Sequence, residues 1–379
     1  RPAVLAHPAM DALLTPELKD LRARARALAD EVLMPRAEAA DRDEKFPAEQ
    51  MKALADAGFL AMLVPTEKGG NGHGPIGYAL AMTEMARACA STSVTMAVTN
   101  MVADAVHAWG NAEQIEIHVP AIASGRYVAG AFALSEPGSG SDAASLQATA
   151  VRDDDDYVLN GNKCWITSGD HAGLVLVMAK TDPDAKARGI STFLVDPKSE
   201  GFSVGRHEDK MGLRGSTTVT INLEDVRVPA SARLGEEGTG FKVAMRALDG
   251  GRIGIAAQAL GIAQGAFDEA VRLLGCCPDA LVQGAAELDA ARAMVLRASW
   301  LKAEGRPFSR EASMAKLFST ESANRICQAA HAAVAEAGGV PTATLDRAVR
   351  DVRVTTIYEG TSEIQRIVIA RKLFEALPA

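Results

Sequence analysis

One glutamate stands where a carboxylate could both hold and release a proton. Glu359 and Gly360 form a turn before a helix, whose start is indicated by the capping-box spacing of Ser362 and Gln365. The helix dipole favours the ionised carboxylate, whereas burial under a ligand favours the protonated acid. This tension suits a general base. The other interpretation of such an isolated glutamate is a helix cap or a solvated surface charge.

A second candidate is the tryptophan in the segment Lys163–Gly169. The indole of Trp165 and the hydroxyl of Thr167 should lie on one face of a strand, because alternate residues share a face. A flat ring beside a hydroxyl suits a planar heteroaromatic ligand that offers hydrogen-bonding edges. The competing interpretation places Trp165 in the core of a β unit.

A third candidate, Gly138–Ala143, formally matches the dinucleotide fingerprint G-x-G-x-x-A. That fingerprint requires a strand before it and a helix after it. Tyr127–Leu134 could be the strand, but Ser145–Val151 alternates like another strand, which argues against a Rossmann site. A Gly/Ser turn whose amides and hydroxyls face a phosphate or pyrophosphate by another geometry remains open.

Composition excludes several classes of function. The chain has 379 residues, enough for two or three domains, and its 48% hydrophobic and 23% charged residues are typical of a globular protein. A formal net charge of −8 argues against a nucleic-acid partner, and no apolar run approaches the ~20 residues of a membrane helix. Without a CxxC pair, the five cysteines indicate buried thiols in a reducing compartment, and the scattered histidines give no support for a metal site.

The elements that must position these residues fall into three regions. Residues 1–126 show helical periodicity, residues 127–235 show strand patterns, and residues 236–379 are helical again. No βαβ alternation is present, so we expect a mainly α, α+β protein without a doubly wound parallel sheet. The longer helices are expected at Ile76–Ala90, Val94–Trp109, Val243–Leu274, Ala285–Ala303, Arg310–Ala337 and Ser362–Leu377.

Taken together, five motifs resemble those of the acyl-CoA dehydrogenase family and occur in the same order. They are Phe132–Asp142, Trp165–Thr167, Lys210–Ser216, Asp225–Pro229 and Tyr358–Thr361. The resemblance covers nearly the whole chain and is closest to short-chain and short-branched-chain members. It implies an N-terminal helical domain, a central β-barrel-like domain and a C-terminal four-helix bundle.

The resemblance also implies an FAD cofactor between the β domain and the bundle, completed by a neighbouring subunit of a homotetramer. Cofactor-binding positions of the family are matched by Phe132, Leu134, Ser135, Gly140, Ser141, Trp165, Thr167, Gly338, Gly339, Thr361 and Glu363. Substrate-binding positions are matched by Ser141, Asp249, Arg252, Tyr358 and Gly360. Glu359 matches the catalytic base. Some members place the base immediately before the arginine instead, where this chain has Gly251, so one candidate base remains.

The activity implied by the resemblance is α,β-dehydrogenation of a short acyl-CoA, straight or 2-methyl-branched, to the trans-2-enoyl-CoA. Glu359 would remove the α-proton while the β-hydride passes to flavin N5, and an electron-transferring flavoprotein would accept the electrons. The implied location is the cytoplasm, or the mitochondrial matrix in a eukaryote. Oxidase or elimination chemistry on the same scaffold, or a non-catalytic partner subunit, are the alternatives, and an intact Glu359 favours a catalyst.

The sequence departs from the family pattern at two places that concern the cofactor. Gly275–Asp279 replaces a stretch whose arginine reaches the FAD pyrophosphate of an adjacent subunit, and Ala335 replaces a glutamine before Gly338 and Gly339. At Glu363 the family often has glutamine.

The acyl cavity is expected to be walled by the helix Val94–Trp109, through Met96, Asn100 and Met101. The alternative is that these three residues are ordinary core.

Overall fold

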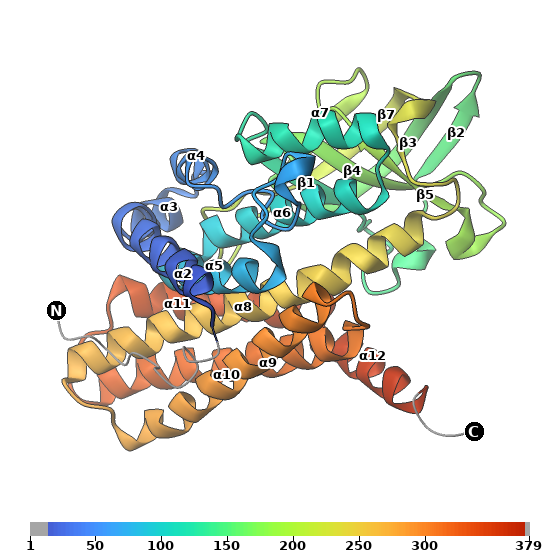
Figure 1. Cartoon of the computed structure of the whole chain (residues 1–379). Coiled ribbons are helices and arrows are strands. Elements are labelled where there is room, and N and C mark those ends of the chain that lie inside the picture. The colour runs from blue at the N-terminus through green and yellow to red at the C-terminus, as the bar shows by residue number, and fades with distance from the viewer. Residues whose placement is uncertain (1–13, 376–379) are drawn as a thin grey trace.

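The computed structural model describes residues 14–375, and most of them are helical (Figure 1). The first helices are α2 (Pro16–Leu28), the π-helical turn η1 (Ala29–Leu33), α3 (Met34–Asp43), α4 (Ala48–Asp56), α5 (Gly74–Ala88), α6 (Ala90–Trp109) and α7 (Ala112–Ala123). The strands are β1 (Ala129–Ala133), β2 (Thr149–Asp153), β3 (Asp156–Thr167), β4 (Ala172–Lys180), β5 (Ile190–Val195), β6 (Phe202–His207), β7 (Thr218–Pro229) and β8 (Arg233–Leu234). The last helices are α8 (Gly240–Leu274), α9 (Asp279–Ala303), α10 (Ser309–Glu336), α11 (Ala343–Val352) and α12 (Ser362–Phe374).

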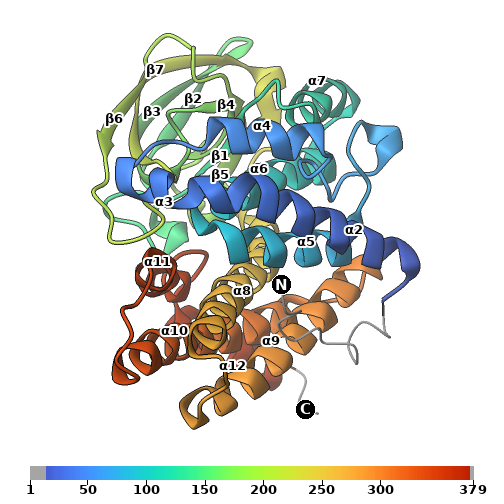
Figure 2. The same cartoon turned by 90° about the vertical axis from the view of Figure 1, so that its left-hand side faces the viewer.

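The three groups stack, with the N-terminal helices between the sheet and the C-terminal helices (Figure 2). Helix α8 is the central element, since it packs against α5, α6, α9 and α10 and reaches β5. Its residues from Gly251 to Gln264 are buried on every side, as expected for a helix enclosed by others. Glycine at 261 permits this packing, because a Cβ there would lie 2.2 Å from the carbonyl oxygen of Thr83 on α5.

The strands form an eight-stranded sheet in the order β6-β7-β3-β2-β4-β5-β8, with β1 pairing parallel to β4. Apolar side chains from most of these strands gather in a core of their own. A tight turn within the aspartate run 153–156 joins β2 to β3, with Asp153 opposite Asp156. The register of β3 against β7 shifts between Lys163 and Ile166, so a β-bulge lies at Trp165.

A buried ion pair holds the first predicted cofactor motif to strand β3. The Nζ of Lys163 lies 2.7 Å from Oε1 of Glu136 and donates to the carbonyl of Leu134 at 3.2 Å. The same carboxylate accepts from the backbone N–H groups of Gln147 and Ala148. Burial lowers the pKa of Lys163, and Glu136 opposes that shift. Because every oxygen of Glu136 has a donor, this internal charge is fully compensated.

The motif Lys210–Ser216 links the three groups of elements. Leu213 donates its N–H to Oδ1 of Asp351 on α11 at 2.6 Å, and the Ser216 hydroxyl lies 3.2 Å from that of Thr95 on α6. Arg350, also on α11, forms an ion pair with Asp41 of α3. The segment therefore ties the sheet to helices at both ends of the chain.

The structure confirms the fold class and corrects several details. The shorter helices α2, α3, α4, α7 and α11 were not given individual bounds in the prediction, and the expected end of the last helix at Leu377 lies outside the described residues. The segment after the Gly/Ser turn begins as the 3₁₀ turn Ala143–Ser145 before strand β2. The expectation of five buried thiols was wrong for Cys276 and Cys277, which lie exposed between α8 and α9, whereas the other three are buried.

Residues 14–375 contain neither a membrane-spanning helix nor a cluster of metal ligands. No helix within residues 14–375 is long and apolar enough to cross a bilayer. In the same part of the chain, no group of three or more histidine, cysteine or acidic residues is placed to hold a metal ion.

Candidate active site

Glu359 lies in a tight turn between the 3₁₀ turn η6 (Arg353–Thr356) and helix α12. Its φ angle is 55°, in the left-handed region, and that of Gly360 is 91°. A left-handed conformation costs a non-glycine residue about 1 kcal/mol or more, so contacts from elsewhere must hold it.

Two helices supply those contacts through the carbonyls of the turn. Lys316 of α10 donates from Nζ to the carbonyl of Gly360 at 2.8 Å. Gln365 of α12 donates from Nε2 to the same oxygen at 2.8 Å and to the carbonyl of Glu359 at 3.3 Å. The N-cap of α12 is Thr361, whose hydroxyl accepts from the N–H of Ile364.

The N-cap of α12 is therefore Thr361 and not Ser362, so the capping box predicted from Ser362 and Gln365 was wrong. Ser362 is the first residue of the helix, and its hydroxyl donates to Glu321 of α10 at 2.6 Å. Gln365 reaches back past the N-cap to the turn. Through its hydrogen bonds to the carbonyls of Glu359 and Gly360, Gln365 supports the conformation of the turn directly.

The carboxylate of Glu359 is buried against helix α8. An ideal Cβ at Gly251 would lie only 1.8 Å from Oε2 of Glu359, so any other residue at 251 would require this carboxylate to move. Oε2 has no hydrogen-bond partner in the structure. A buried carboxylate oxygen without a donor is costly, which is a common property of catalytic groups.

Burial raises the pKa of Glu359 to about 7, although Arg252 and Lys316 lower it in part. A carboxyl group with this pKa is present in both protonation states near neutral pH. It is therefore suited to take a proton in one step and release it in another. The interpretation of Glu359 as a solvated surface charge was wrong.

The predicted substrate residues Asp249 and Arg252 form a buried ion pair on α8, beside this carboxylate. Arg252 Nη1 lies 2.5 Å from Asp249 Oδ1, which also accepts from Ser309 of α10 at 3.0 Å. The Nε of Arg252 has no partner. Asp249 thus balances most of the charge of Arg252.

Two tyrosines flank the base. The ring of Tyr358 packs against the C-terminal helices, and its hydroxyl donates to Gln258, which anchors this predicted substrate residue to α8. Tyr78 of α5, which the sequence did not indicate, lies against Gly254, where a Cβ would be 2.5 Å from its hydroxyl. Burial raises the pKa of Tyr78, as does the charge of Glu359, so the phenol stays neutral.

The residues predicted to bind a planar ring lie together on the sheet. Trp165 is 58% exposed and has a φ of 58° at the bulge in β3, so its interpretation as core was wrong. A Cβ at Gly140 would lie 3.6 Å from the indole, which places the Gly/Ser turn beside it. Ser135 accepts from the N–H of Cys164, and this bond joins the two motifs. Thr167 follows on the same strand, and Ser141 is exposed on the turn.

Phe132 lies where the sheet meets α6 and α8, in contact with the small apolar cluster of Val98, Met101 and Ala247. Leu134 is buried two residues further along. Among the three residues expected to wall the cavity, only Met101 belongs to this cluster. Asn100 instead bonds the backbone at Phe59 and Met62, and Met96 is core, so the expectation was wrong for those two.

Some predicted cofactor residues are remote from the base. Gly338 and Gly339 follow the C-terminal end of α10, whereas Lys316 lies near its beginning. At 1.5 Å per residue, the two ends of this stretch are about 30 Å apart. Glu363 is exposed on the first turn of α12, beyond the N-cap Thr361. One chain alone does not assemble all the predicted cofactor residues around Glu359.

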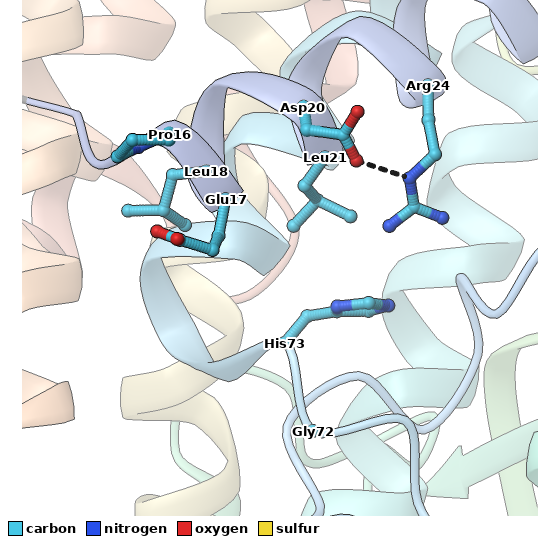
Figure 3. Close-up of a pocket in the computed structure, with 8 residues that line it drawn as sticks. All are labelled: Pro16, Glu17, Leu18, Asp20, Leu21, Arg24, Gly72 and His73. Carbon is cyan, nitrogen blue, oxygen red and sulfur yellow. Dashed lines mark hydrogen bonds and ion pairs between the residues drawn. The ribbon is translucent and has the colours of Figure 1, made fainter.

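A separate surface pocket of about 510 Å³ lies between α2 and the loop before α5 (Figure 3). Leu18, Leu21 and the ion pair of Asp20 with Arg24 face His73 across it. Burial lowers the pKa of His73, and so does the charge of Arg24. The pocket contains none of the predicted site residues.

The raised pKa of Glu359 predicts a pH-dependent cost in stability. A buried acid whose folded pKa exceeds its usual value stabilises the fold below about pH 4.5, and this contribution is lost as the pH rises through about 7. Glu359→Gln, which is neutral and nearly isosteric, should therefore raise the free energy of unfolding above pH 7, by at most ~3 kcal/mol. At pH 4.5 it should change little.

Urea unfolding at pH 4.5 and pH 8 measures this difference. Glu116→Gln, on the exposed side of α7, is the control and should have no effect at either pH. An equal effect of Glu359→Gln at both pH values would show that ionisation of the carboxylate is not the cause.

Comparisons with known proteins agree with this arrangement. The chain matches the models of the acyl-CoA dehydrogenase N-terminal domain over residues 15–126, the middle domain over 131–226, and the C-terminal domain over 238–276 and 277–374. It is 44% identical to the human mitochondrial short-chain specific acyl-CoA dehydrogenase, over 93% of this chain and 88% of that one. It is also 40% identical to acryloyl-CoA reductase (NADH) of Anaerotignum propionicum, over 97% and 96% of the two chains.

Among solved structures, butyryl-CoA dehydrogenase from Megasphaera elsdenii superposes with a TM-score of 0.91 at 34% identity, covering 95% of this chain and 99% of that one. The similarity extends over all three groups of elements and includes the turn that carries Glu359. The chain therefore belongs to the acyl-CoA dehydrogenase family, the FAD-dependent oxidoreductases that act on the CH–CH bond of acyl-CoA thioesters.

Proposed function

We propose that this protein dehydrogenates a short acyl-CoA thioester, straight or 2-methyl-branched, to the trans-2-enoyl-CoA, with Glu359 as the base. The observation that carries the proposal is the buried carboxylate of Glu359, unpartnered at Oε2, with a pKa near neutrality. A group of this kind can remove the weakly acidic α-proton of a thioester once the substrate covers it. The names of the relatives, short-chain and butyryl-CoA dehydrogenases, support the substrate class.

The chain's own groups would orient the substrate and exclude water. The left-handed turn would point the carboxylate at the α-carbon, and the N–H of Glu359 would donate to the thioester carbonyl as negative charge develops there. Tyr358, Gly360 and the pair of Asp249 with Arg252 would border the acyl group. Bound FAD would supply the hydride acceptor for the β-carbon.

The residues of the sheet fit a planar cofactor. Trp165 presents an open indole face, Thr167 follows it on the strand, and the Gly140 backbone lies beside the ring without a side chain in between. Ser141 would serve both the cofactor and the CoA part of the substrate. Phe132, Leu134 and Ser135 would line the same cofactor from the first motif.

A homotetramer would explain the remaining cofactor residues. Gly338 and Gly339, about 30 Å from Lys316 along α10, would bind the FAD of a neighbouring subunit, as would Thr361 or Glu363. Helix α12 projects from the bundle and exposes Phe374 to 73% (Figure 1). Exposed apolar side chains of this kind favour burial against another chain.

Both departures from the family pattern lie at one end of the bundle. Thr342, just after Gly339, donates to Glu269 in the last turns of α8, close before the Gly275–Asp279 segment.

An electron-transferring flavoprotein would accept the electrons from the reduced enzyme. A soluble compartment, cytoplasmic or mitochondrial, suits such a partner.

Glu359→Gln should retain FAD and bind acyl-CoA, but lose flavin reduction almost completely, because the amide cannot accept the α-proton. Stopped-flow bleaching of the flavin by butyryl-CoA measures the reduction rate, and equilibrium titration measures binding. Reduction of the variant at close to the wild-type rate would remove Glu359 from the mechanism.

Trp165→Ala should weaken FAD retention by about tenfold, because the stacking surface is lost while the base remains. The ratio of flavin to protein absorbance after gel filtration measures retention. Trp300→Ala is the matched control, since Trp300 is also exposed but lies on α9. Unfolding of the Trp165 variant with unchanged flavin affinity would contradict a cofactor role.

We expect turnover to be greatest with C4 or C5 thioesters. Tyr78 lies against Gly254, and the carboxylate of Glu359 lies against Gly251. These two glycines are about one helical turn apart on α8, a rise of about 5 Å along the helix axis. Each methylene that fits contributes about 0.8 kcal/mol of burial, and each one that does not fit meets steric overlap. Turnover rates from C4 to C12, measured with an artificial electron acceptor, test this. A maximum at C8 or longer would overturn the short-chain assignment.

A further inference from the structure

Lys316 is a fully buried lysine in a position that calls for an explanation. It lies on the buried face of α10, which it shares with Ala312, Ala315 and Ser319, and its relative exposure is 0%. Lysine is rarely buried without an ionic partner. Yet no carboxylate among residues 14–375 lies within ion-pair distance of its ammonium group, and its one hydrogen bond goes to the carbonyl of Gly360.

That hydrogen bond acts on the turn that carries the base. The carbonyl of Gly360 receives two donors, Lys316 from α10 and Gln365 from α12, each at 2.8 Å. This carbonyl belongs to the peptide that joins Gly360 to Thr361, which is thus clamped between two helices, and Gln365 also donates to the Glu359 carbonyl at 3.3 Å. These bonds support the turn in which the left-handed Glu359 directs its carboxylate toward Gly251.

Two cations act on the base, since the charges of Arg252 of α8 and then of Lys316 of α10 lower the pKa of Glu359. They differ in their partners: Asp249 lies 2.5 Å from the guanidinium of Arg252, whereas Lys316 has no such carboxylate among the described residues. Tyr78 of α5 faces the carboxylate as a neutral phenol. On the other side of Lys316, Glu321 of α10 accepts from a serine, and Glu363 of α12 is exposed.

We propose that Lys316 is the positioning residue of the base. Its ammonium group clamps the Gly360 carbonyl and, as a cation without a carboxylate within ion-pair distance among residues 14–375, joins Arg252 in favouring ionisation of the buried Glu359 carboxylate. This inference rests on the proposed role of Glu359 and adds to it a reason why the residue can be charged at all.

The direction of the electrostatic effect follows from the opposing shifts of the two groups. Burial lowers the pKa of Lys316 to about 7, while Glu359 raises it, and Lys316 in turn lowers the pKa of Glu359. Each group therefore favours the charged form of the other. Removing the lysine leaves Arg252 as the cation that opposes the effect of burial, so the pKa of the carboxylate must rise.

Three variants of the holoenzyme test the proposal. Lys316→Met removes the charge and the donor at similar volume, and Lys316→Arg keeps both. Thr320→Val, one turn further along α10, removes a buried hydroxyl that bonds only within the helix. Infrared spectra over a pH range follow the carbonyl stretch of the protonated Glu359 carboxyl, which is assigned by its disappearance in Glu359→Gln. The pH profile of flavin reduction by butyryl-CoA is the second measurement.

In Lys316→Met we expect the infrared midpoint to rise by about one pH unit or more. Flavin reduction at pH 7 should fall about tenfold and recover in part at higher pH, where the carboxylate ionises. Lys316→Arg should keep the midpoint near the wild-type value. Thr320→Val should match the wild type in both measurements.

An unmoved infrared midpoint in Lys316→Met, or a rate reduced equally at every pH, would overturn the proposal and leave Lys316 a structural residue. Should the methionine variant fail to fold, Lys316→Gln removes the charge with a polar group and carries the same expectation. The infrared midpoint does not depend on turnover. A fully active Glu359→Gln variant would therefore refute the proposed function, whereas the midpoint separately decides the role of Lys316.

Discussion

Burial of a carboxylate without a hydrogen-bond donor at one of its oxygens is the constraint on which the rest of the site depends. The side chain of Glu359 occupies space that a Cβ at position 251 of α8 would need, and the left-handed turn directs it there. That conformation needs two donors on the Gly360 carbonyl, and the charge needs a cation nearby. The left-handed turn and the unpartnered carboxylate oxygen lower the stability of the fold, but they leave a carboxyl group that can hold and release a proton near neutral pH.

The sequence predicted the architecture well because long buried helices and alternating strands leave strong periodic signals. Helices α6 and α8 begin only a few residues before their expected starts. The helices without predicted bounds are short and have weaker signals. For example, α7 contains Pro120, which is typical of a helix end, and α11 is a ten-residue segment after a glycine- and proline-containing loop. The prediction also placed the N-cap of α12 one residue too late, because Thr361 and Ser362 are both suitable N-cap residues.

The candidate site could be predicted only in part. Glu359 and Trp165 stand in motifs with recognisable neighbours. The exposure of Trp165 agrees with a binding role, although no sequence pattern distinguished this residue from a core tryptophan. Lys316 and Tyr78 approach the base only through helix packing, which no local pattern encodes. For Lys316 one signal was available: a lysine at a position of α10 where the periodicity calls for an apolar residue.

The contact between Gly251 and Glu359 has a consequence for how such a site can change. In some members of the family a side chain at the position of Gly251 is the base, and here the Glu359 carboxylate fills that same volume. The two positions are far apart in the chain but converge on one point in space. A side chain at 251 and the Glu359 carboxylate in its present position would therefore compete for one volume. If the base moved from the turn to the helix, the carboxylate of Glu359 would have to leave this place or be lost.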